Sequence, residues 1–131
     1  MGAWSEKNFG NDSALDWVNE FLESPSIDFV QDTLQQVIEN DDYIEVDEAT
    51  SALAAAEVVA ALKGKPSSDF PKEIHDNLAS LSQPDGLDKL AVQAVNKVIS
   101  GSELQELWEG DGSIPDPEWR AAINDLLNRL K

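Results

Sequence analysis

The densest group of side chains that could do chemistry is a run of carboxylates near the middle of the sequence. Six acidic residues fall within ten positions and no basic residue lies among them: Glu39, Asp41, Asp42, Glu45, Asp47 and Glu48. Like charges at this density repel one another, and a cationic partner relieves the repulsion. Tyr43 and Ile44 lie inside the run and would supply the apolar centre that a charged rim usually surrounds. These residues form the predicted partner-binding surface, and a solvated loop with a helix cap is the alternative interpretation.

A further carboxylate stands out because of its surroundings. Glu57 lies within the most apolar segment, which runs from Ala52 to Leu62, where a bare carboxylate would be desolvated. Paired carboxylates can run general acid–base catalysis or hold magnesium. No second carboxylate lies at helical spacing on this segment. We therefore favour a structural Glu57 that faces the one solvent-exposed angle or bonds a buried amide or indole N–H, over a catalytic acid.

Most other catalytic and metal chemistries lack the residues that they need. The sequence has no cysteine and one histidine, His75, which lies between Glu73 and Asp76 on the polar side of its segment. Nucleophilic catalysis needs a positioned base, and zinc sites need several His or Cys ligands. The acids that follow Asp41 and Asp111 lack the EF-hand spacing, and no glycine-rich phosphate loop follows a strand. We predict no catalytic residues, no metal ligands and no cofactor.

Net charge limits the kind of partner that the chain can bind. The sequence holds 26 acidic and 9 basic residues, which gives a net charge of −17 at pH 7, and residues 1–60 carry 14 of the acids and 1 of the bases. Phosphate backbones and anionic membranes would repel such a surface, so we predict no direct nucleic-acid or membrane binding. The alternative is that the acidity serves solubility alone.

Helical periodicity and capping signals recur along the chain. They predict helices over residues 13–23, 27–39, 49–62, 70–78, 87–100, 103–109 and 117–130. Leu15, Val18 and Leu22 mark the inward stripe of the first helix, and Ser26 caps the second. Asp47 is the expected cap of the 49–62 helix, which is alanine-rich and apolar on nearly every face. Residues 43–46 are expected to form an extended linker or an isolated strand.

These helices are expected to share one hydrophobic core. Hydrophobic residues make up 41% of the sequence and four tryptophans are present, which a packed core explains and a disordered acidic chain does not. No glycine- or proline-rich linker divides the chain. The prediction is an all-α single domain over residues 1–131, an irregular bundle of about six to seven helices around the central alanine-rich helix.

Two stretches resemble a known family when they are read together. The opening contains Met1-Gly2-Ala3-Trp4, Phe9-Gly10-Asn11-Asp12 and Ala14-Leu15-Asp16-Trp17, and the centre contains Ala52-Leu53-Ala54-Ala55-Ala56-Glu57-Val58-Val59. With Ser102 to Trp108 and Trp119-Arg120, they resemble the bacterial family called domain of unknown function 4259. The sequence departs from it at Ser5, where the family usually has glycine. The resemblance implies no activity, but it implies that Trp4, Asn11, Asp12 and Glu57 form a structural unit.

Taken together, these features predict a macromolecule-binding protein and not an enzyme. The specific hypothesis is an immunity-type inhibitor that docks its acidic face on a basic toxin such as a nuclease, because a nuclease groove attracts negative charge. The alternatives are a carboxylate- and metal-dependent cytoplasmic enzyme and a structural subunit. The lack of cysteine and of a secretion signal favours the cytoplasm.

Overall fold

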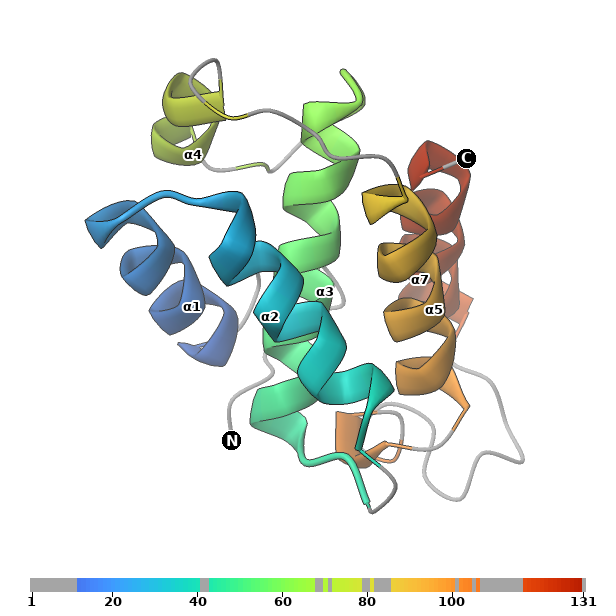
Figure 1. Cartoon of the computed structure of the whole chain (residues 1–131). Coiled ribbons are helices and arrows are strands. Elements are labelled where there is room, and N and C mark those ends of the chain that lie inside the picture. The colour runs from blue at the N-terminus through green and yellow to red at the C-terminus, as the bar shows by residue number, and fades with distance from the viewer. Residues whose placement is uncertain are drawn as a thin grey trace.

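The computed structural model describes residues 12–40, 43–67, 70, 72–78, 81, 86–100, 102–104, 106 and 117–130. The helices in this part of the chain are α1 (Asp12–Glu23), α2 (Ile27–Ile38), α3 (Val46–Leu62), α4 (Lys72–Asn77), α5 (Leu87–Ile99) and α7 (Pro117–Leu130). Figure 1 shows α3 running through the middle, with α1 on its left, α2 crossing in front of it toward α5, and α5 and α7 on its right. The predicted all-α bundle around an alanine-rich helix is confirmed.

The central position of α3 follows from its composition. Its residues from Ala52 to Ala61 are all buried, and the helix packs against α1, α2, α5 and α7. Small alanine side chains let these neighbouring backbones approach closely, while Leu53, Val58 and Val59 fill the spaces between them. No described helix has the length and apolar character that crossing a membrane requires.

The end of α3 was predicted correctly and its start was not. After the C-cap Lys63, the N–H of Gly64 donates to Ala61 O and that of Lys65 donates to Ala60 O, both at 2.9 Å, around Gly64 at φ +85°. This is the Schellman geometry that favours glycine. At the other end the N-cap is Glu45 and not the predicted Asp47, because Glu45 and Glu48 form a capping box.

The connection between α1 and α2 is a short turn through Pro25. As predicted, Ser26 caps α2, and its Oγ accepts a hydrogen bond from the Phe29 N–H at 3.2 Å. The prediction that Leu15 faces inward is wrong, since 40% of this residue is exposed. The buried stripe of α1 instead comprises Ala14, Trp17, Val18 and Phe21. Leu15 follows Ala14 directly, and this step of one residue along α1 rotates its side chain out of the buried stripe.

Two lysines bind the carbonyls at helix ends, and one of them also pairs with a carboxylate. Lys97 on α5 directs its ammonium to the Ile38 and Asn40 carbonyls at the end of α2. Lys63 directs its ammonium to the Leu130 carbonyl at the end of α7 and to the Asp88 carboxylate, at 3.1 Å from the latter. Positive charge is stabilising at a helix C-terminus because the carbonyls there carry partial negative charge.

Candidate docking surface

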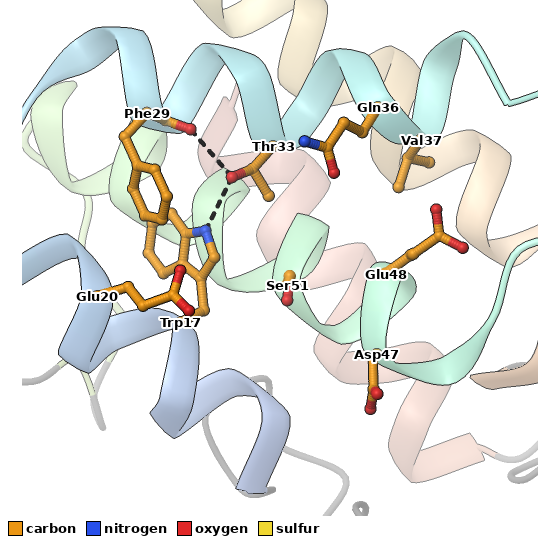
Figure 2. A pocket seen from close by; sticks show the side chains of 9 residues that line it. All are labelled: Trp17, Glu20, Phe29, Thr33, Gln36, Val37, Asp47, Glu48 and Ser51. Atoms are coloured by element: carbon orange, nitrogen blue, oxygen red, sulfur yellow. Dashed lines mark hydrogen bonds between the residues drawn. The ribbon is translucent and has the colours of Figure 1, made fainter.

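A groove of about 250 Å³ opens where α1, α2 and α3 meet, and Figure 2 shows the side chains around it. They are Trp17, Glu20, Phe29, Thr33, Gln36, Val37, Asp47, Glu48 and Ser51. An adjoining hollow of about 190 Å³ shares four of them and adds Asp16. The continuous depression therefore has walls on three consecutive helices.

The floor of the groove is aromatic and rigid. The rings of Trp17 and Phe29 stack with their centroids 5.3 Å apart, and Phe21 lies 5.5 Å from Trp17 on the same helix. The Trp17 indole N–H donates to Thr33 Oγ1 at 2.8 Å, and that hydroxyl donates to the Phe29 carbonyl at 2.9 Å. Because the buried indole N–H has its partner within the chain, the ring is held in one orientation before any ligand arrives.

The rim of the groove is acidic on two sides. Asp16 and Glu20 come from α1, and Asp47 and Glu48 come from the first turn of α3. In Figure 2, Glu20 lies beside the stacked rings, and Glu48 lies at the opposite end near Val37. Carboxylates on facing walls above an apolar floor concentrate negative potential within the groove. Asp47 and Glu48 belong to the predicted partner-binding surface, whereas Asp16 and Glu20 were not predicted to be part of it.

The ion pairs of the described lysines and arginines lie away from Asp16, Glu20 and Glu48. They join Lys63 to Asp88, and Arg129 to Glu57 and Asp125. None of them includes Asp16, Glu20 or Glu48, so these three carboxylates are not neutralised by a described lysine or arginine. The negative charge of Asp16, Glu20 and Glu48 is therefore available to a ligand.

The rest of the predicted acidic surface surrounds the start of α3. Glu39 is the exposed C-cap of α2, and Glu45 is exposed at the N-cap of α3. Asp41 and Asp42 lie outside the described residues. Tyr43 is 51% exposed, as the prediction required, but its ring is tethered, because its hydroxyl donates to Glu106 Oε2 at 2.6 Å. This bond, aided by the negative charge of Glu106, raises the pKa of Tyr43 to about 12.

The prediction that Ile44 anchors a partner is wrong. Its exposed fraction is 1%, so it belongs to the hydrophobic core. The reason is an isolated parallel bridge to Ser102, in which the Glu103 N–H donates to the Ile44 carbonyl at 2.8 Å. The extended conformation predicted for residues 43–46 holds at Ile44 and Glu45, whereas Val46 already begins α3. Pairing with Ser102 turns the Ile44 side chain inward.

The same bridge brings Glu103 and Glu106 next to the predicted acidic surface. These two residues were not predicted to be part of it. Glu103 Oε1 accepts a hydrogen bond from the Val46 N–H at 2.8 Å, and Glu106 receives the Tyr43 hydroxyl. A second short run of glutamates near residue 103 was visible in the sequence. Its proximity to the first run was not, because the two are more than fifty residues apart.

Glu57 does not face solvent, which was one of the two expected arrangements, and its described partner is Arg129, which was not predicted. Its exposed fraction is 2%, and both carboxylate oxygens accept hydrogen bonds from Arg129, Nη1 to Oε1 at 2.6 Å and Nη2 to Oε2 at 3.0 Å. Burial lowers the pKa of Arg129, but the bonds and charges of Glu57 and Asp125 outweigh it and hold that pKa above its ordinary value. Trp4, Asn11 and the Asp12 side chain lie outside the described residues.

The described part of the chain offers neither a cluster of metal ligands nor a buried histidine. No three His, Asp or Glu side chains gather there closely enough to hold a metal ion. His75 is exposed on α4, as its neighbours in sequence predicted. The chemistry of the site is therefore that of carboxylates above an aromatic floor.

The family relationship is clear from comparison with known proteins. The family described as Domain of unknown function (DUF4259) matches residues 2–122 of this chain. The chain belongs to the DUF4259 family. The match extends from the opening segment into α7 and confirms the resemblance seen in the sequence. No curated protein and no solved structure matched the chain. The description of the DUF4259 family names no activity, so a function must be argued from the site.

Proposed function

We propose that this DUF4259 protein binds a basic protein through the groove between α1, α2 and α3 and the acidic surface beside it. The observation that carries the proposal is the placement of carboxylates on facing walls of a rigid, aromatic-floored groove. An apolar centre inside a charged rim is the usual anatomy of a protein interface. The partner that fits is one that presents lysine or arginine on a convex surface.

The groove suits a long cationic side chain. The alkyl stem of a lysine or arginine can pack along the Trp17 and Phe29 rings while its charged head lies between Glu20 and the first turn of α3. Arginine has the further advantage that its planar guanidinium stacks on aromatic rings and binds carboxylates in a bidentate manner. Because Thr33 and Trp17 already bond each other, insertion needs no rearrangement of the floor.

The charge of the whole chain supports rapid binding to such a partner. A net charge of −17 produces a long-range field that attracts a basic protein and accelerates its encounter. The same field repels nucleic acids, which share the sign of the charge. A strongly acidic binder is therefore well suited to compete with nucleic acid for one basic surface.

The specific partner that we propose is a toxin such as a nuclease, which this protein would inhibit as an immunity protein in the bacterial cytoplasm. A nuclease holds its substrate in a cationic groove, and an acidic protein surface can occupy that groove in place of phosphate. The alternative of a carboxylate-based enzyme is not favoured by Glu57, because the Arg129 guanidinium contacts both of its oxygens.

The proposal is tested with the protein encoded by the neighbouring gene, purified alone and assayed for nuclease activity. The parent chain is expected to inhibit it at stoichiometric concentration. Asp16→Lys/Glu20→Lys reverses the charge of one wall, and Ser51→Phe fills the groove without a change in charge. Each is expected to weaken inhibition by about tenfold or more, equivalent to about 1.4 kcal/mol.

A matched control separates the groove from net charge. Glu23→Lys/Asp76→Lys makes the same change in net charge at exposed positions of α1 and α4 that do not line the groove. It is expected to inhibit nearly as well as the parent. Inhibition by the Ser51→Phe variant at the parent's concentration would rule out the groove as the docking site, and lack of any effect of the parent chain would rule out this toxin.

A further inference from the structure

The face formed by α5 and α7 is lined by one carboxylate, one lysine and otherwise uncharged residues. Two hollows of about 410 and 480 Å³ lie on it and share Val92. Their other lining residues are Asp88, Lys89, Gln93, Asn96, Asn124, Leu127, Asn128 and Leu130. The sequence from Lys89 to Ser102 holds no acidic residue, although the chain has 26 of them. This face, defined by those lining residues, is called the amide face below.

The amide face combines an apolar strip with neutral hydrogen-bonding groups. Val92 and Leu127 are partly buried along the middle, and the exposed side chains of Asn96, Asn124 and Asn128 flank them. Each amide offers both donors and an acceptor, so one amide can bond another of its own kind. This property makes the face complementary to itself.

The one carboxylate that lines the amide face is already engaged. Asp88 Oδ2 accepts a hydrogen bond from Lys63 Nζ at 3.1 Å, and that bond lowers the pKa of Asp88. The neighbouring Lys89 is exposed and adds a positive charge. The lining of the face therefore carries no excess of negative charge.

We propose that the amide face docks a second copy of this chain. Two molecules of net charge −17 repel each other, so they can associate only through a surface that brings no unpaired carboxylates together. An isologous two-fold contact places the same residues opposite one another, and amides satisfy that requirement where charges of one sign do not. Contact between the Val92 and Leu127 strips of two copies removes apolar area from water.

This arrangement is compatible with the docking groove. The amide face lies on α5 and α7, which Figure 1 shows on the right of α3, and the groove lies where α1, α2 and α3 meet. A dimer formed through the amide face leaves both acidic grooves open. The amide face also offers a basic protein no carboxylate rim, which is why the second copy is the occupant that fits it.

The test is the molecular mass of the full chain in solution, measured by sedimentation equilibrium over a wide range of concentration and at two salt concentrations. A dimer is expected, and its dissociation constant should fall as salt rises because salt screens the repulsion between the two acidic molecules. Binding of a basic partner through the acidic groove should weaken with salt. Because salt should strengthen the dimer and weaken binding of the basic partner, the measurement can contradict one proposal without contradicting the other.

Substitutions then locate the interface. Asn124→Asp/Asn128→Asp keeps side-chain size and places like charges opposite each other, so dimer affinity should fall by about tenfold or more, or about 1.4 kcal/mol. Asn19→Asp, which adds one negative charge at an exposed position of α1, is the control for charge placed away from the face and should leave the dimer intact. Circular dichroism and thermal melting of each variant show whether the fold is preserved.

A distance measurement completes the test. The sequence has no cysteine, so Asn128→Cys introduces a single labelling site on the amide face. Spin labels there should show a short distance between copies, and labels at Asn19→Cys should show a much longer one. A monomer at millimolar concentration in both salts would overturn the proposal, as would a dimer that Asn124→Asp/Asn128→Asp leaves unchanged.

Discussion

The Glu57 carboxylate on α3 and the Arg129 guanidinium on α7 form a bidentate ion pair inside the bundle. The exposed fractions of the two side chains are 2% and 14%, and Arg129 Nε also donates to Asp125 at 2.8 Å. The pair joins the central helix to the last described one across 72 positions of sequence. Removing one partner from a buried pair leaves an uncompensated charge, whereas replacing both by apolar groups is often nearly neutral.

Arg129→Met is therefore expected to lower the free energy of unfolding by about 3–5 kcal/mol. The double variant Glu57→Met/Arg129→Met should recover much of that loss, because no charge remains buried. Lys72→Met, which removes an exposed cation of α4, is the control, and it should cost much less. Urea unfolding monitored by circular dichroism measures all three. An unchanged unfolding midpoint for Arg129→Met would show that the pair does not stabilise the bundle.

Tyr43 provides a spectroscopic test of the contact between the start of α3 and Glu106. It is the only tyrosine in the sequence, so ultraviolet absorbance of tyrosinate follows this residue alone. Its pKa is expected at about 12, above the ordinary 10.0, because the phenol donates to Glu106. Glu106→Gln should shift the titration back toward 10, and a parent midpoint at 10 would show that the hydrogen bond is absent in solution.

The same shift predicts how stability depends on pH. The folded state keeps the Tyr43 proton up to a higher pH than the unfolded chain does. Between the unfolded pKa near 10 and the folded value of about 12, the unfolded state has already lost this proton, so unfolding releases it. The contribution of the bond is complete below pH 10 and is lost as pH rises to 12. Thermal melting of the parent and Glu106→Gln across this range measures it.

Lys97 is expected to stabilise the junction between α2 and α5. Its ammonium donates to the Ile38 and Asn40 carbonyls at the end of α2, which would otherwise lack these donors. Lys97→Met should lower the free energy of unfolding by about 1–3 kcal/mol. Lys72→Met, at an exposed position of α4, is the control and should change little. Equal urea midpoints for the two variants would show that the helix end does not need the lysine.

Local signals were enough to predict the six described helices, whereas most of the predicted helix over residues 103–109 lies outside the described residues. Ser26 at the start of α2 and Gly64 after α3 act through hydrogen bonds to residues only a few positions away, which is why capping patterns identified both. Because α3 is apolar on nearly every face, its burial could be predicted without knowing how the other helices pack against it. The misplaced cap at Asp47 is a local error, because the capping box that starts α3 is formed by Glu45 and Glu48, three positions apart.

The site was predictable only in part, because its geometry depends on contacts distant in sequence. The acidic run was evident, but the inward orientation of Ile44 depends on Ser102, and no local pattern reveals that pairing. The groove floor was hidden for a similar reason. Trp17 and Phe29 each look like core residues of their own helices, and only the packing of α1 against α2 stacks them beneath an acidic rim.

The most direct test of the proposed function is the association rate of the basic partner at low and moderate salt. It should be measured for the parent, for Asp16→Lys/Glu20→Lys, and for Glu23→Lys/Asp76→Lys, whose net charge equals that of the first variant. The parent should associate rapidly and slow steeply as salt rises, because the groove's carboxylates steer the encounter. The groove variant should associate about tenfold more slowly with a flatter salt dependence, and the control should remain near the parent. Equal rates for the two variants would show that net charge alone attracts the partner and would contradict docking at the groove.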